Sequence, residues 1–177
     1  LDDQGGTQGS LLAQTLLVSN PGSSSVSFEL VRYLHADLLF DGSLLDGGGR
    51  IVNPIYVEIL FETDSGGSGT TDTTFVGITS VGGTEPSSNR WELDEYPSLT
   101  NAILGGSALT DTIFQDGDGD SFVDLGSEYD IELGLRNTFN LAPGASTEYT
   151  THTLFGSGAP SDVAPPSPPP PPPPSPP

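Results

Sequence analysis

Residues 129–139, YDIELGLRNTF, alternate between apolar and polar side chains along most of their length. The apolar set comprises Tyr129, Ile131, Leu133, Leu135 and Phe139. The opposite set contains Asp130, Glu132 and Arg136. Because successive side chains of a strand point to opposite faces of a sheet, this period of two predicts a half-buried β-strand.

The same pattern recurs elsewhere in the chain. It is clearest in VSFELVRYL (26–34) and in IYVEILFE (55–62), where Glu58 and Glu62 fall opposite the apolar residues. Further strands are expected at 11–19, 73–81, 89–95 and 146–155. Clusters of Gly, Pro, Asp and Ser at 19–25, 41–49, 64–72 and 141–146 are typical of turns. The sequence therefore predicts an all-β fold, an antiparallel β-sandwich of the immunoglobulin-like or jelly-roll-like type.

One segment, 96–114, lacks this alternation. There we expect Ser98 to cap a short helix that ends at Gly105–Gly106. Two other segments, LLVSNPGSSSVSFEL (16–30) and NTFNLAPGASTEYTTH (137–152), carry a resemblance. They are similar to the hairpin and the sheet-crossing corner of immunoglobulin-like bacterial surface modules.

The charge of the chain argues against several partners. Its 177 residues include 24 Asp and Glu but only four bases, which gives a net charge of −20. Such a surface repels the phosphates of nucleic acids and anionic lipids. No run approaches the roughly 18 apolar residues of a membrane span. We therefore expect neither a nucleic-acid partner nor a membrane span.

Two residue types, Cys and Met, are missing from the sequence. Without Cys there are no disulfides and no thiolate metal ligands. Without an initiator Met, we expect the start at Leu1 to be a processed or excerpted end, most simply one left by removal of a signal peptide. With the acidic, lysine-free surface, this favours an extracellular location at the cell surface.

The chain divides into three expected segments. These are a flexible N-terminal segment at 1–10, a β-sandwich domain at 11–156 and a proline-rich arm at 157–177. The arm is expected to adopt the extended polyproline II conformation, and its Ser-Pro-rich runs resemble extensin-type wall glycoproteins. Seven consecutive prolines are its expected contact with a second copy of the chain: Pro168, Pro169, Pro170, Pro171, Pro172, Pro173 and Pro174.

The stretch FQDGDGDSFVDLGSEYDIE (114–132) contains seven carboxylates and no base. Closely spaced aspartates in a tight, glycine-containing turn can supply the about six to eight oxygens that Ca²⁺ takes. Their DxDxD core resembles the calcium loops of EF-hand, dockerin and thrombospondin-type proteins. The resemblance implies a Ca²⁺ site within 116–128, with these ligands: Asp116, Asp118, Asp120, the carbonyl of Phe122, Asp124 and Glu128.

The loop departs from that family pattern in two places. Ser121 stands where Gly is usual, and Ser127 stands where a bidentate Glu is usual, with Glu128 one place later. The helix pair of an EF-hand is also missing, because a strand is expected to follow directly. The alternative is a solvated acidic turn, against which the lack of a basic neighbour argues.

Nothing in the sequence predicts an enzyme, since no G-x-S-x-G elbow is present and His35 and His152 are expected to be sheet-face residues. We expect a non-enzymatic, calcium-stabilised structural module that assembles into a filament or layer. Its joint would be an exposed edge strand at 11–19 or the proline-rich arm. The alternative is a carbohydrate-binding module in which Trp91 and Tyr96 stack on a glycan. An exposed, coplanar aromatic pair beside the acidic loop would favour that alternative, and a buried Trp91 would favour the structural role.

Overall fold

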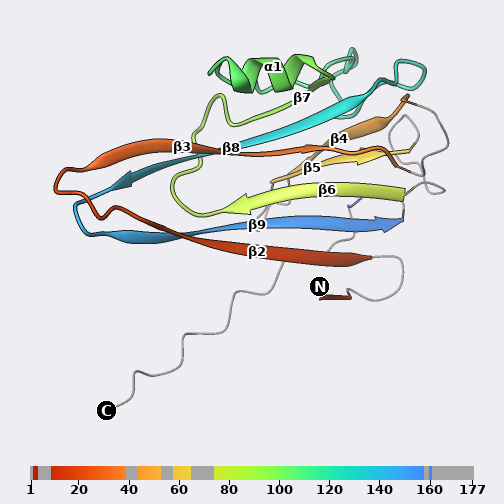
Figure 1. Cartoon of the computed structure of the whole chain (residues 1–177). Helices are drawn as coiled ribbons and strands as arrows, with labels where there is room; N and C mark the ends of the chain where they lie inside the picture. Colours follow the sequence, from red (N-terminus) through yellow and green to blue (C-terminus); the bar gives the residue numbers. More distant parts are fainter. Residues whose placement is uncertain are drawn as a thin grey trace.

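The computed structural model describes residues 2–3, 9–38, 44–52, 58–64, 74–157 and 160. These residues form two antiparallel sheets and one short helix, which confirms the predicted all-β sandwich (Figure 1). The larger sheet has the order β1-β2-β9-β6-β5-β4, and the smaller sheet has the order β3-β8-β7. The element bounds are β1 Asp2–Asp3, β2 Ser10–Ser19, β3 Val26–His35, β4 Gly47–Val52, β5 Glu58–Thr63, β6 Thr74–Val81, β7 Trp91–Glu95, α1 Ser98–Leu104, β8 Ile131–Leu141 and β9 Ser146–Ser157.

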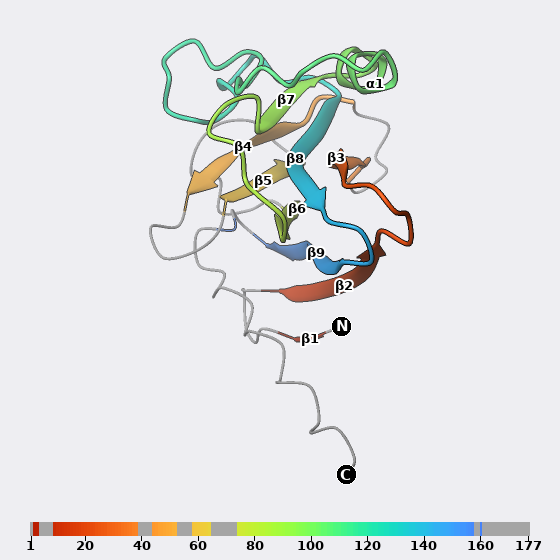
Figure 2. The same cartoon turned by 90° about the vertical axis from the view of Figure 1, so that its left-hand side faces the viewer.

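The main hydrophobic core lies between the two sheets. Leu60 and Ile78 of the larger sheet pack in one cluster with Leu133 and Leu135 of β8, and all four are fully buried. The apolar alternation predicted for 129–139 is confirmed on this side of β8. Figure 2 shows α1 on the outer side of the smaller sheet.

The outer face of β8 differs from the sequence-based expectation. The alternation predicts an exposed face for Glu132, but α1 lies over this face and the side chain is fully buried. The Tyr33 hydroxyl donates to Glu132 Oε1 at 2.6 Å, and the backbone N–H of Thr100 in α1 donates to Oε2 at 3.0 Å. The prediction that β8 is only half-buried is therefore wrong at Glu132, because the alternation of side chains cannot reveal that a helix packs on the polar face of the strand.

Strand β4 replaces part of a predicted turn. The sequence pattern predicts a turn at 41–49, but Gly47–Val52 forms a strand at the edge of the larger sheet. The glycines allow close packing instead of a chain reversal. A Cβ on Gly48 would lie 2.6 Å from the carbonyl oxygen of Phe61 and 2.9 Å from Cδ1 of Ile131.

Helix α1 occupies the predicted position, but the predicted cap is wrong. The N-cap is Pro97, with no side-chain cap hydrogen bond, and Ser98 is the first helical residue. The Pro97 carbonyl accepts the first bond of the helix, from the N–H of Asn101 at 3.0 Å. Leu99 is fully buried and holds this short helix against the smaller sheet.

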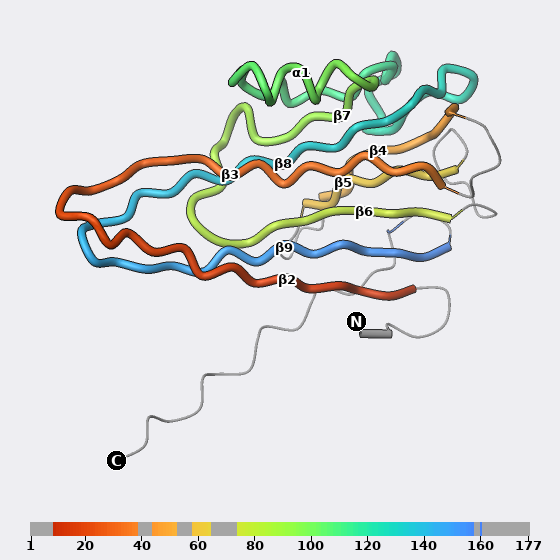
Figure 3. The backbone as a smooth tube through the Cα atoms, viewed as in Figure 1, coloured from red at the N-terminus to blue at the C-terminus, as the bar shows by residue number. Residues whose placement is uncertain are grey.

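Two connections between the sheets meet at one end of the sandwich (Figure 3). The β2–β3 and β8–β9 corners join where the N–H of Asn20 donates to Ala145 O at 2.9 Å and the N–H of Gly144 donates to Asn20 O at 2.8 Å. The buried Asn20 side chain also donates to the carbonyls of Leu141 and Ala142, at 3.0 and 3.1 Å. The turns predicted at 19–25 and 141–146 are thus confirmed, and one asparagine links them.

The two ends of the chain fall only partly within the described residues. Within the segment predicted to be flexible, Asp2–Asp3 forms β1 and pairs with Ser10 and Leu11 of β2. Strand β9 extends to Ser157, one residue into the predicted arm. Apart from Ser157 and Pro160, the arm lies outside the described residues, including the prolines at 168–174.

Candidate calcium site in the acidic loop

The acidic loop is attached on its N-terminal side to the smaller sheet. The N–H of Leu93 in β7 donates to Thr112 O at 3.0 Å, and the N–H of Phe114 donates to Leu93 O at 3.0 Å. Ile113, between them, is buried in the core between the sheets. Residues 112–114 therefore run along the edge of β7 as an added extended segment.

On its C-terminal side, the loop is attached to the larger sheet. The N–H of Arg50 in β4 donates to Ser121 O at 2.9 Å, and the N–H of Val123 donates to Gly48 O at 2.9 Å. Val123 is fully buried between the sheets, while Phe122 packs against a second apolar cluster on the larger sheet. The aspartates at 116–120 thus lie in the segment that connects the edges of both sheets.

Three of the predicted ligands come together. Asp116, Asp118 and Asp120 each offer one carboxylate oxygen, and these oxygens lie within 4.8 Å of one another. Backbone N–H groups orient the Asp116 carboxylate, since Gly119 donates to Oδ1 at 2.8 Å and Ser121 donates to Oδ2 at 3.2 Å. None of the ion pairs found among the described residues involves an aspartate of this loop. Such an oxygen cluster has the chemistry of a site for a hard cation.

Ser121 stands where calcium loops usually have Gly, but its backbone has the conformation that Gly would adopt there. Ser121 has a φ of 74°, in the left-handed region that Gly adopts at the same place in calcium loops. A non-glycine residue in this region costs roughly 1–2 kcal/mol. The sharp turn of the loop is therefore made with serine, at some cost in stability.

The other three predicted ligands, Asp124, Glu128 and the carbonyl of Phe122, belong to residues that make different hydrogen bonds within the loop. Asp124 closes the loop, because its Oδ2 accepts the N–H of Gly117 at 3.0 Å. Glu128 accepts the N–H of Gly126 at 2.9 Å and so holds its own turn. The N–H of Phe122 donates to Asp120 Oδ1 at 2.9 Å; this bond does not involve the carbonyl oxygen of Phe122, which is the predicted ligand atom.

The two aromatic residues of the glycan alternative have separate partners. Trp91 is half-buried against the core, and the guanidinium carbon of Arg50 lies 4.5 Å from its ring centroid. Tyr96 is 48% exposed and stacks on His35 with ring centroids 4.7 Å apart. Each ring therefore has one face covered by another side chain of the protein.

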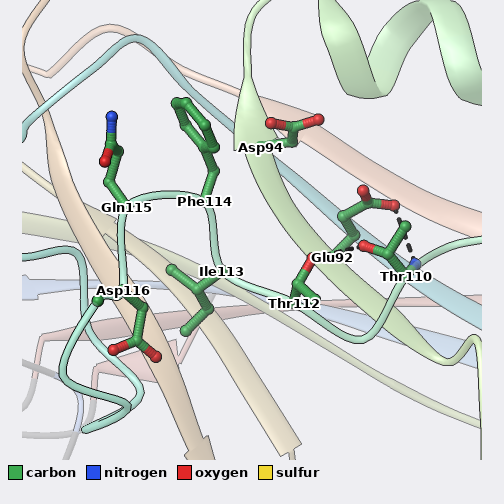
Figure 4. Close-up of a pocket in the computed structure, with 9 residues that line it drawn as sticks. Glu92, Asp94, Thr110, Thr112, Ile113, Phe114, Gln115 and Asp116 are labelled. Atoms are coloured by element: carbon green, nitrogen blue, oxygen red, sulfur yellow. Dashed lines mark hydrogen bonds between the residues drawn. The ribbon is translucent and has the colours of Figure 1, made fainter.

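An open groove of about 440 Å³ lies beside the acidic loop (Figure 4). Strand β7 contributes Glu92 and Asp94 to its lining, and the loop contributes Phe114 and Asp116. Glu92 accepts the N–H of Thr110 at 3.2 Å, and burial raises the pKa of Glu92. In Figure 4 the Asp116 carboxylate points away from those of Glu92 and Asp94, so the three acids do not converge on one point.

A second polar cluster was missed by sequence reasoning. His35, Asp37 and Asp130 each place a possible ligand atom within 4.8 Å of the others, next to the buried acids Asp46 and Glu62. These residues come from four separate parts of the sequence, and only His35 and Asp37 are close to each other in the chain. The alternation at 55–62 predicts Glu62 on the polar side of its strand, and this prediction is wrong, because Glu62 is fully buried on the same side of β5 as the core residue Leu60.

Comparison with models of known protein families gives no match, and comparison with curated proteins gives none either. Within the described ranges, no helix has both the length and the apolar character needed to cross a membrane.

Proposed function

We propose that the protein is a non-enzymatic, calcium-stabilised structural module of an extracellular surface protein. The observation that carries this proposal is the clustering of Asp116, Asp118 and Asp120 in a loop bonded to the edges of both sheets. A Ca²⁺ ion bound there would relieve the repulsion between the carboxylates and fix the segment that links β7 to β4. The ion would thus serve the fold and not a reaction.

Assembly of copies through strand β2 is the second part of the proposal. Only Ser10 and Leu11 pair with β1, so the outer backbone edge of β2 from 12 to 19 has no strand partner among the described residues. Leu16 and Leu17 on this strand are 54% and 71% exposed. An exposed apolar edge can pair with a strand of another copy, through backbone hydrogen bonds.

Two other sheet edges are covered. The segment 112–114 runs along β7, and the segment 121–123 runs along β4. Strand β3 is also an edge strand, but from Leu30 to His35 it is half-buried. This contrast favours β2 as the joint. The proline-rich arm is the second candidate joint, because its fixed φ angles reduce the entropy lost on docking.

The assembly proposal is tested by electron microscopy and sedimentation of the full chain with Ca²⁺. Leu17→Lys should abolish assembly, because a charged residue on an edge strand opposes strand pairing. Leu104→Lys is the matched control, since Leu104 is 81% exposed at the end of α1, away from β2. Equal assembly of Leu17→Lys and the unchanged chain would exclude β2 as the joint.

A further inference from the structure

A group of acids and one histidine gathers at the end of the sandwich opposite the Asn20 corner. Strand β3 ends at His35, whose register partner on β8 is Glu132, so Asp130 lies just beyond it. Asp46 pairs with Tyr129 and immediately precedes β4, and Glu62 of β5 pairs with Gly48. The topology therefore brings together His35, Asp37, Asp46, Glu62 and Asp130, which come from four separate parts of the sequence.

The outer part of this group has the spacing of metal ligands. His35 Nε2 lies 2.7 Å from Asp130 Oδ1, and an oxygen of Asp37 completes a set within 4.8 Å. The His35 ring is fixed by stacking on Tyr96. His35 and Asp130 are partly buried, with side-chain exposures of 26% and 18%, so the group opens to solvent on one side.

The inner part of the group is a pair of buried carboxyls, and three of their four oxygens have no hydrogen-bond partner among the described residues. Glu62 is fully buried, and neither of its oxygens has a partner of normal geometry among the described residues. Asp46 is 3% exposed, and its Oδ2 is likewise without a partner in this part of the chain. A buried polar group without a partner costs about 1–3 kcal/mol, and more when it is charged.

The charges of the outer part contribute to the raised pKa values of the inner carboxyls. Burial is the main cause that raises the pKa of Glu62 to about 9; the charges of Asp46, Asp37 and Asp130 contribute to this rise, and the nearby backbone of Ala36 opposes it. Burial likewise raises the pKa of Asp46 to about 7, with Asp130 as the largest charged contributor. Glu62 also shares the inward face of β5 with Leu60, which lies in the core between the sheets.

The four arginines are engaged elsewhere. Arg50 pairs with Glu58, Arg90 pairs with Glu58 and Glu85, and Arg136 pairs with Glu29. Arg32 donates to the hydroxyl of Thr153 at 2.8 Å. The group of acids therefore receives no arginine in any of the hydrogen bonds or ion pairs found among the described residues.

We propose that His35, Asp37, Asp46, Glu62 and Asp130 form a second metal site, which binds a divalent first-row transition metal. An imidazole nitrogen among carboxylates suits Zn²⁺ or Mn²⁺, whereas Ca²⁺ takes oxygen ligands. The metal would supply the missing partners of Asp46 and Glu62. It would also tie the ends of β3, β4, β5 and β8 together, independently of the acidic loop.

Isothermal titration of the full chain with ZnCl₂, and separately with MnCl₂, in saturating CaCl₂ tests this site. We expect one equivalent of at least one of these ions to bind and to raise the melting temperature. Glu62→Gln keeps the shape of the side chain but removes its charge, and Asp37→Asn changes an exposed ligand; each should weaken binding by about tenfold or more.

Two control variants separate this site from other metal binding. His152→Gln changes the only other histidine, which lies on β9, and Asp118→Ala disables the acidic loop. Both should bind Zn²⁺ or Mn²⁺ as the unchanged chain does. Absence of binding by both ions, equal binding by Glu62→Gln and the unchanged chain, or a second Ca²⁺ taken up in place of the transition metal would each overturn the proposal.

Discussion

Glu132 and Glu62 are both fully buried, but their surroundings differ. Glu132 accepts hydrogen bonds from the Tyr33 hydroxyl and from Thr100. Burial, with a contribution from Glu132, raises the pKa of Tyr33 to about 12, so this phenol remains a donor. Glu132 thus links α1 to the smaller sheet, whereas Glu62 makes no comparable bond to any other described residue.

Replacing Glu132 should therefore be costly. In Glu132→Gln, an amide NH₂ replaces an acceptor that faces donors, and we expect a loss of about 1–3 kcal/mol in the free energy of unfolding. Chemical denaturation measures this loss. Glu148→Gln, at an exposed position on β9, is the control and should change little. Equal effects of the two substitutions would contradict the role assigned to Glu132.

His152 gives a prediction for pH dependence. It is 6% exposed, and burial lowers its pKa from the usual 6.5. Below about pH 6.5, His152 becomes protonated in the unfolded chain before it does so in the folded chain. Acid therefore favours unfolding through this residue. The contribution grows as pH falls, by at most about 1.4 kcal/mol per pH unit.

The comparison of the unchanged chain with His152→Gln isolates this effect from the carboxylates. Denaturation at about pH 7.5 and about pH 5.5 should show that the unchanged chain loses more stability in acid than the variant does. Identical losses in the two proteins would show that His152 does not resist protonation.

At the scale of elements, the two corners that share Asn20 are a single unit. Asn20→Ala should leave the carbonyls of Leu141 and Ala142 without their side-chain donor, at a cost of about 2–4 kcal/mol. Asn140→Ala, on the same strand as Leu141 but exposed, is the matched control. Thermal melting of both variants measures the difference, and equal melting temperatures would contradict the proposed role of Asn20 in holding the two corners together.

The elements also mark how far the sequence is informative. Period-two alternation located β3 and β8, and turn residues located both corners, because these features are local. Strand β4 was missed since its glycines serve close packing with Phe61 and Ile131, which are distant in sequence. The acidic loop was visible through its spacing, but the group around Glu62 was not, because only tertiary pairing assembles it.

At the scale of the whole molecule, the two ends of the sandwich are held differently. One end is closed by the Asn20 hydrogen bonds. At the other end and along the adjacent edges, carboxylates gather in two groups that lack arginine partners among the described residues. On the proposed account, cations complete this half of the fold, so its stability depends on the metal content of the surroundings.

Removal of residues 165–177 tests the contribution of the proline-rich arm. A tract of prolines cannot join a strand ladder, so the shortened chain should keep its melting temperature. Its assembly with Ca²⁺ should be weakened, because one of the two candidate joints is gone. Sedimentation and electron microscopy measure the assembly. Undiminished assembly would make the arm a spacer and leave β2 as the joint.

The central claim, that Ca²⁺ in the acidic loop stabilises the sandwich, is tested most directly by calorimetric melting with CaCl₂ and with chelator. At a hundredfold excess over the dissociation constant, a bound ion adds about 2.7 kcal/mol, which corresponds to a rise of several degrees in melting temperature. We predict this rise for the unchanged chain and for the control Glu95→Ala, which alters an exposed acid outside the loop, and its loss in Asp118→Ala. A melting temperature that is unchanged by chelator, or a rise that persists in Asp118→Ala, would contradict the account.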